Sequence, residues 1–96
     1  GYLKDARQLR LVVVLLDIRR EPDDRDRRLQ AWLDHYGIPA CYALTKADKV
    51  NRQEAVRAQR SVGAALGLTE PALLTSARSG QGIAELRAVL ARTVAP

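Results

Sequence analysis

Two short polar segments of this sequence carry residue types that could recognise a purine base. One is a Thr-Lys-Ala-Asp tetrapeptide that ends at Asp48, and the other is a Ser-Ala-Arg tripeptide that begins at Ser76. A carboxylate can accept two hydrogen bonds from the ring N–H and the exocyclic amine of guanine, whereas adenine has no such pair of adjacent donors. A site built around these bonds rejects a base that leaves the carboxylate unpaired. Asp48 is therefore the candidate guanine acceptor.

Neighbouring residues could complete the base site. The aliphatic stem of Lys46 can lie along the face of the base, and backbone amides near Ser76 and Ala77 can donate to the guanine carbonyl oxygen. We expect no catalytic residue and no metal ligand among them. The candidate nucleotide-binding residues are Thr45, Lys46, Ala47, Asp48, Thr75, Ser76, Ala77 and Arg78.

Three apolar segments are expected to be the strands that position these residues. They cover about residues 11–16, 40–45 and 72–75. The first is an unbroken run of Leu and Val, which is typical of a parallel strand covered on both faces. Ligands of open parallel sheets bind at the carboxyl ends of the strands, where both polar segments lie.

Helical patterns alternate with the strands. The first helix after residue 22 has an apolar stripe at i, i+3, i+4 and i+7, which we expect to be core, and it ends at Gly37. That stripe consists of Leu29, Trp32, Leu33 and Tyr36. The second helix is expected to begin with a capping box of Asn51 and Glu54 and to end at Gly67.

A last helix is expected to begin after Gly80 and Gly82. At the other end of the chain, the spacing of Leu3, Ala6 and Leu9 indicates the tail of another helix before the first strand. This alternation predicts a three-layer α/β fold with three parallel strands and flanking helices. We expect residues 1–96 to form a single domain.

The charge of the chain is unevenly distributed. The net charge is +5, but five acidic residues cancel five arginines between Asp17 and Arg28, which predicts a salt-bridged helix start. A basic patch is expected around the second helix instead. Its members are Lys46, Lys49, Arg52, Arg57 and Arg60. The sequence has neither a run of about 20 apolar residues nor the features of a signal peptide, so we expect a cytoplasmic protein.

The order and spacing of the motifs resemble the C-terminal half of the EngB family of bacterial TRAFAC GTPases. The two polar segments look like the fourth and fifth GTPase motifs, [NT]KxD and SA[KR], and Gly80-Gln81-Gly82-Ile83 looks like the family's GxGI segment. The resemblance covers nearly the whole chain. It implies a P-loop-GTPase-like half-domain that binds GTP or GDP, in a parent protein that acts in large ribosomal subunit assembly and cell division.

The parts of a GTPase that hold the phosphates are missing from these 96 residues. No GxxxxGK[ST] or DxxG segment occurs, and the only lysines are Lys4, Lys46 and Lys49. Phosphoryl transfer depends on that lysine, the backbone cradle and a metal ion. This stretch alone is therefore not expected to hydrolyse GTP, and the Mg²⁺ that the resemblance implies would be held by the parent.

Two other classes of function stay open. The chain could be a non-enzymatic binding module or scaffold, associated with ribosomal RNA, with a vestigial nucleotide site; alternatively it could be a small flavodoxin-like enzyme, although it has no nucleophile with a base.

We expect Asp17 and Arg19 to form a local ion pair rather than to contact nucleotide. An uncovered edge at the first strand predicts dimerisation or strand exchange.

Overall fold

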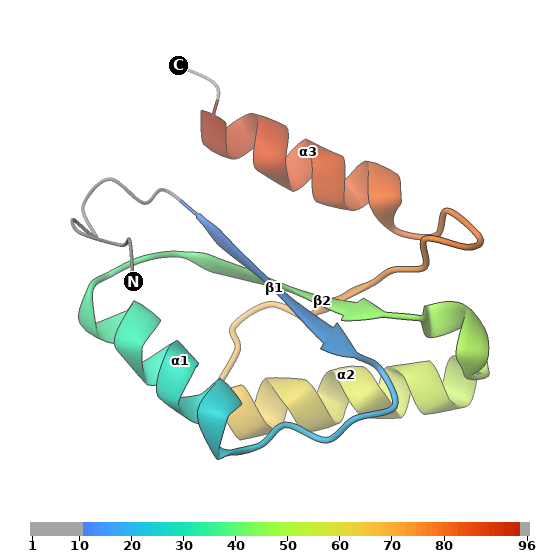
Figure 1. The fold of residues 1–96 in the computed structure, drawn as a ribbon, viewed down its shortest axis with the longest axis horizontal. Coiled ribbons are helices and arrows are strands. Elements are labelled where there is room, and N and C mark those ends of the chain that lie inside the picture. Colours follow the sequence, from blue (N-terminus) through green and yellow to red (C-terminus); the bar gives the residue numbers. More distant parts are fainter. Residues whose placement is uncertain (1–10, 95–96) are drawn as a thin grey trace.

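The computed structural model describes residues 11–94, and its three strands form one parallel sheet. The strands are β1 (Val12–Asp17), β2 (Ala40–Thr45) and β3 (Leu73–Leu74), hydrogen-bonded in that order. Asp17 is paired with Thr45, and Leu44 with Leu74. The carboxyl ends of the strands therefore meet at one edge of the sheet, as Figure 1 shows. The predicted parallel sheet is confirmed, although β3 is shorter than the expected residues 72–75.

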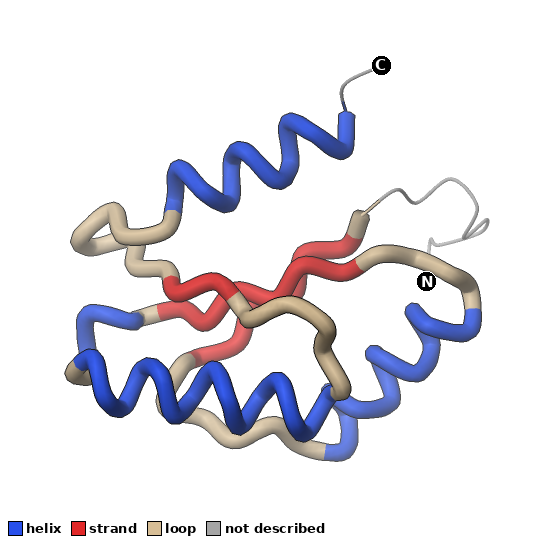
Figure 2. The backbone as a smooth tube through the Cα atoms, turned by 180° about the vertical axis from the view of Figure 1, so that it is seen from behind, coloured by secondary structure: helices blue, strands red, loops and turns tan. Residues whose placement is uncertain are grey.

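The helices lie on both faces of this sheet. Helices α1 (Asp24–His35) and α2 (Arg52–Leu66) are on one face, and α3 (Ile83–Val94) is on the other (Figures 1 and 2). A short 3-10 helix, η2 (Ala47–Lys49), connects β2 to α2. The three-layer α/β arrangement is thus confirmed, while the helix expected around Leu3 to Leu9 lies outside the described residues.

The predicted helix boundaries have clear physical causes. The Glu54 N–H donates to Asn51 Oδ1 at 2.8 Å, and the Asn51 N–H donates to Glu54 Oε1 at 3.1 Å, so both halves of the expected capping box are present. Gly67 ends α2 with a φ of 64°, and Gly37 follows α1 with a φ of 65°. This left-handed conformation favours glycine because a side chain would crowd the backbone.

The core lies mainly between the sheet and α2, and it is almost entirely aliphatic. Its buried members are Leu16, Ile18, Tyr42, Leu44, Ala47, Ala55, Val62, Leu66 and Ala72. Helix α1 adds Leu33, which is fully buried. The Tyr42 hydroxyl donates to Gln30 Oε1 of α1 at 2.6 Å, so the one polar atom of this core tyrosine is satisfied at the sheet–helix boundary.

Two side chains differ from the expected core. Leu15 of β1 is 63% exposed, because only α3 covers that face of the sheet among the described residues. Tyr36 is 53% exposed, because α1 ends at His35 and the tyrosine occupies the cap position, where it lies 5.0 Å from the Trp32 ring. The helical periodicity was correct, but it continued one residue beyond the helix.

Candidate guanine site

The two candidate loops meet through one short hydrogen bond. The Ser76 hydroxyl donates to Asp48 Oδ1 at 2.6 Å, although the two residues are 28 positions apart. This bond lowers the pKa of the Asp48 carboxyl, to which Lys49 and Arg78 also contribute as nearby cations. Asp48 is therefore an ionised, acceptor-only group at neutral pH. Its side chain lies on the exposed side of η2, where a ligand could reach it.

The Asp48 carboxylate can still accept a pair of donors from a base. A carboxylate has about four lone-pair positions, and the Ser76 hydroxyl occupies one. The Ser76 hydroxyl is the one side-chain group among residues 11–94 that donates to this carboxylate, so acceptor positions remain for a ligand. The donor set of guanine, two parallel N–H groups, thus fits the acceptor that this site presents.

The Ser76 hydroxyl is itself held in place. Ser76 is only 1% exposed, and its Oγ accepts from the Ser79 N–H at 3.1 Å while donating to Asp48. The Ser76 N–H donates to the Gln81 carbonyl at 3.0 Å. This differs from the expectation for Ser76, because its amide is already used; of the two amides, only that of Ala77 lacks a partner in the described part of the chain.

Sequence reasoning missed the roles of Ser79 and Gln81. Both act on Ser76 through backbone atoms, which every residue type has, so their side chains give no signal. The only sequence hint is that both lie between Ser76 and Gly82 in a segment too short to form an element of its own.

Thr75 and Ala47 fix the spacing between the loops rather than presenting side chains to a ligand. The Thr75 N–H and hydroxyl both donate to the Leu44 carbonyl, at 2.8 and 3.0 Å. The Ala47 N–H donates to the Thr75 carbonyl at 2.9 Å. Both residues are buried, with Ala47 packed in the core, so a larger side chain at position 47 would displace the loop.

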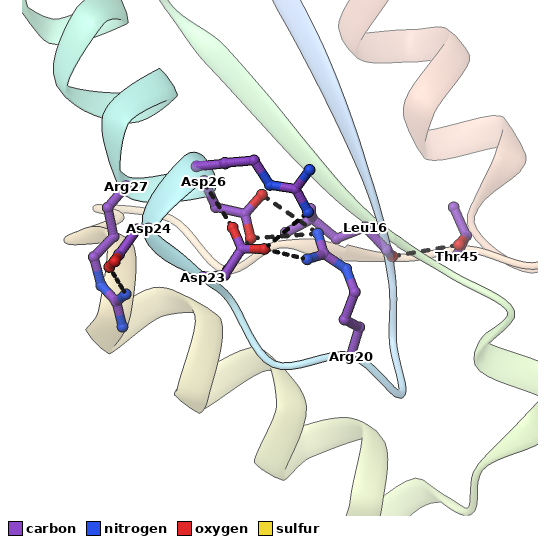
Figure 3. Close-up of polar contacts among 8 residues, drawn as sticks. Leu16, Arg20, Asp23, Asp24, Asp26, Arg27 and Thr45 are labelled. Atoms are coloured by element: carbon purple, nitrogen blue, oxygen red, sulfur yellow. Dashed lines mark hydrogen bonds and ion pairs between the residues drawn. The ribbon is translucent and has the colours of Figure 1, made fainter.

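Thr45 and Lys46 form the turn that leads to Asp48. The Thr45 hydroxyl donates to the Leu16 carbonyl of β1 at 3.3 Å (Figure 3), so it links the two strands at their carboxyl ends. Lys46 has a φ of 61°, and it is the one non-glycine residue with positive φ in the described chain. Backbone strain of this kind persists where the surrounding structure imposes it, and it is common at binding sites.

The ammonium group of Lys46 contacts the end of β1. Lys46 Nζ lies 3.5 Å from Asp17 Oδ2, and Arg19 donates to the same carboxylate from its backbone N–H at 2.9 Å and from its guanidinium at 3.2 and 3.1 Å. The side-chain and backbone hydrogen bonds from Arg19 lower the pKa of Asp17. Asp17 and Arg19 form the expected local ion pair.

Arg78 completes the exposed border of the site, together with Ala77. A separate cavity of about 460 Å³ lies elsewhere, and its lining includes Ala40, the first residue of β2, together with Pro39 and Pro71, which precede β2 and β3. It is at the amino edge of the sheet, whereas Asp48 and Ser76 are at the carboxyl edge where parallel sheets bind ligands. We therefore assign the candidate site to the open surface at Asp48.

The sequence of the chain is similar to proteins that are named as probable GTP-binding proteins. No protein-family model matches the chain. It is 49% identical over 81 residues to the probable GTP-binding protein EngB of Syntrophus aciditrophicus, a match that covers 84% of this chain and 41% of the relative. The chain is homologous to the EngB proteins. The corresponding protein of Syntrophomonas wolfei is 43% identical over 91 residues, which is 95% of this chain and 47% of that EngB.

The chain spans about half the length of the EngB relatives that it matches, consistent with their C-terminal half. A crystal structure of a probable GTP-binding protein EngB superposes with a TM-score of 0.77 and 16% identity, over 93% of this chain and 57% of the other. Apo translation elongation factor SelB of Methanococcus maripaludis gives a TM-score of 0.74 at 25% identity, over 88% and 20%. The fold of this EngB homologue is therefore a P-loop-GTPase-like half-domain.

Replacing Lys46 by glycine is expected to separate backbone strain from ligand contact in this EngB homologue. Glycine adopts positive φ freely, so the free energy of unfolding should rise by up to about 1 kcal/mol, while binding of a purine should weaken because the aliphatic stem is lost. Urea unfolding and nucleotide titration measure the two effects. Lys46→Ala is the control, since it removes the stem without relieving the strain. A Lys46→Gly variant less stable than Lys46→Ala would contradict this account.

Proposed function

We propose that this chain is the guanine-recognising part of a GTP-binding protein. The hydrogen bond from Ser76 to Asp48 supports the proposal most directly, because it orients an ionised acceptor pair at the carboxyl edge of the sheet. The EngB relatives, named as probable GTP-binding proteins, support the choice of nucleotide. In this proposal the Asp48 carboxylate accepts hydrogen bonds from the ring N–H and the exocyclic amine of guanine. The aliphatic stem of Lys46 lies along the face of the base, and the Ala77 amide donates to the guanine carbonyl oxygen.

The remaining candidate residues act on the geometry of this site. Ser76 orients Asp48, Thr75 and Ala47 fix the distance between the loops, and Thr45 ties the turn to β1. Arg78 lies at the exposed border, where its positive charge favours an ionised Asp48. None of these residues transfers a proton or attacks a bond, so the proposed role is binding rather than catalysis.

The chemistry of GTP hydrolysis is proposed to reside in the parent protein. The sequence of this chain contains no phosphate loop, and the Mg²⁺ that neutralises phosphate charge would be held by the phosphates and by parent residues. A purine of about eleven heavy atoms at roughly 0.3 kcal/mol per atom gives about 3 kcal/mol, which corresponds to binding weaker than 1 mM. This stretch alone should therefore bind guanine nucleotides weakly and leave GTP intact.

We propose, on the resemblance to the EngB family, a cytoplasmic parent that acts in large ribosomal subunit assembly and in cell division. Among the described residues, no helix is both long and apolar enough to cross a membrane. The position of β1 at the sheet edge and the exposure of Leu15 support a further proposal, that isolated chains dimerise or exchange strands there.

Isothermal titration of the 96-residue chain with GDP and with ADP tests the proposed function. GDP is expected to bind at least about tenfold more tightly than ADP, because adenine cannot supply two donors to Asp48. Equal affinities for the two nucleotides would contradict guanine recognition. Binding of RNA without any guanine preference would instead favour the second candidate, an RNA-associated module, which the basic residues of α2 support.

A further inference from the structure

One face of helix α2 presents three arginines around a shallow groove. The groove has a volume of about 570 Å³ and is lined by Arg52, Gln53, Val56, Arg57 and Arg60. These positions follow i, i+1, i+4, i+5 and i+8, so they lie along one side of the helix over about 12 Å, at 1.5 Å per residue. All five side chains are exposed. We call this surface the arginine face.

The arginines of this face differ from those at the start of α1 in having no acidic partner among the residues that the structure describes. Arg20, Arg25 and Arg27 pair with aspartates at 3.0–3.3 Å, and Figure 3 shows this network around Asp23, Asp24 and Asp26. No ion pair involves Arg52, Arg57 or Arg60 within residues 11–94. The acid on this helix nearest to them, Glu54, accepts from the Asn51 N–H in the capping box. The positive charge of the arginine face is therefore not neutralised locally.

The composition of the arginine face fits a phosphate backbone better than an acidic protein. Protein interfaces depend on a buried apolar centre with aromatic anchors, whereas the only apolar member here is Val56, which is 37% exposed. Interfaces with nucleic acids are polar and strongly positive. Guanidinium groups match phosphate oxygens with two parallel hydrogen bonds, which an ammonium group cannot do.

Gln53 gives the arginine face a group that can distinguish RNA from DNA. Its amide side chain has both donors and an acceptor, it is exposed between the arginines, and it has no hydrogen-bond partner in the described chain. The ribose 2′-hydroxyl is itself a donor and an acceptor, and it is the group that DNA lacks. A neutral amide within a row of phosphate-binding cations suits that hydroxyl.

We propose that the arginine face binds the sugar-phosphate backbone of RNA, with Arg52, Arg57 and Arg60 on phosphates and Gln53 on a ribose hydroxyl. The face begins four residues after Asp48, so bound RNA starts beside the guanine site and runs along α2. None of the residues proposed to contact RNA belongs to the candidate guanine site. The surface goes beyond the proposed guanine recognition and does not depend on it.

A matched pair of triple variants tests the arginine face. The first is Arg52→Gln, Arg57→Gln and Arg60→Gln; the control is Arg25→Gln, Arg27→Gln and Arg28→Gln, which removes the same charge from α1. Each is titrated against a fluorescently labelled RNA hairpin at several salt concentrations. The first variant should bind at least about tenfold more weakly, and its slope of log affinity against log salt should fall by about two, at roughly 0.7 to 0.9 per lost phosphate contact.

Circular dichroism and urea unfolding show that both variants are folded before binding is compared, and GDP titration of the same variants separates this surface from the guanine site. A control variant that weakens RNA binding as much as the first would overturn the proposal, since net charge alone would then explain binding. DNA of the same sequence binding as tightly as RNA would also overturn it. So would a polyglutamate peptide that competes as well as RNA, because the partner would then be an acidic protein.

Discussion

Replacing Gly82 by alanine is expected to lower the free energy of unfolding by about 3 kcal/mol or more, the range of severe overpacking combined with backbone strain. A Cβ at this position would lie 2.0 Å from the Leu74 carbonyl oxygen and 3.0 Å from its carbon, and the backbone φ is +73°. Neither atom of Leu74 can move freely, because the residue belongs to β3 and is paired with Leu44. The urea midpoint of unfolding measures the loss.

Gly80 provides the control for the Gly82 experiment. Its φ is +82°, so alanine there is also strained, but no atom lies within 4 Å of the added Cβ. Gly80→Ala should therefore cost only the strain, about 1 to 2 kcal/mol. If the free energy of unfolding falls equally in both variants, the close approach of Gly82 to β3 is not the cause of the loss in Gly82→Ala.

The close approach of Gly82 also matters for the site. It allows the loop from Ser76 to Gln81 to fold back on β3, where the Gly80 N–H donates to the Ser76 carbonyl at 2.8 Å and the Ser76 N–H donates to Gln81. These bonds hold the serine whose hydroxyl orients Asp48. Gly82 is thus a structural requirement of the loop that holds Asp48 in the proposed guanine site.

Asp48→Asn is expected to abolish the preference for guanine over adenine, a change in relative affinity of about a hundredfold or more if both charge-assisted bonds, at roughly 1.5 to 3 kcal/mol each, are lost. The asparagine amide would place a donor against a donor of the guanine edge, while its oxygen could still accept from the Ser76 hydroxyl. Stability should change little because the Asp48 side chain is exposed. Titrations with GDP and ADP measure the preference directly.

The same change should improve binding of xanthosine diphosphate, because xanthine has a carbonyl where guanine has its amine, and the new amide can donate to it. Asp24→Asn is the matched control, since it removes one exposed carboxylate from α1 and should leave the preference intact. An Asp48→Asn chain that still prefers GDP to ADP would show that another group reads the base.

Much of the fold could be predicted because it depends on local chemistry. The apolar runs that form β1 and β2, the Asn51–Glu54 capping box and the glycine at position 67 all use signals contained in a few neighbouring residues. The meeting of the Asp48 and Ser76 loops followed from topology, since parallel strands bring their carboxyl ends together.

Other features depend on contacts that sequence patterns do not contain. The left-handed backbone of Lys46 could not be predicted, because lysine has no preference for it and the surrounding loops impose it. The Ser76 amide was expected to face the ligand, yet it bonds to the backbone of Gln81. The exposure of Leu15 depends on what covers the second face of the sheet, which periodicity cannot show.

The most direct test is an amide NMR spectrum of the isotopically labelled chain, recorded as guanosine monophosphate and then adenosine monophosphate is added. The account predicts that guanosine monophosphate shifts the amide signals of residues 45–48 and 76–79, and that the adenine nucleotide shifts them much less at the same concentration. Equal shifts with both nucleotides, or shifts confined to the opposite edge of the sheet, would contradict base recognition by Asp48.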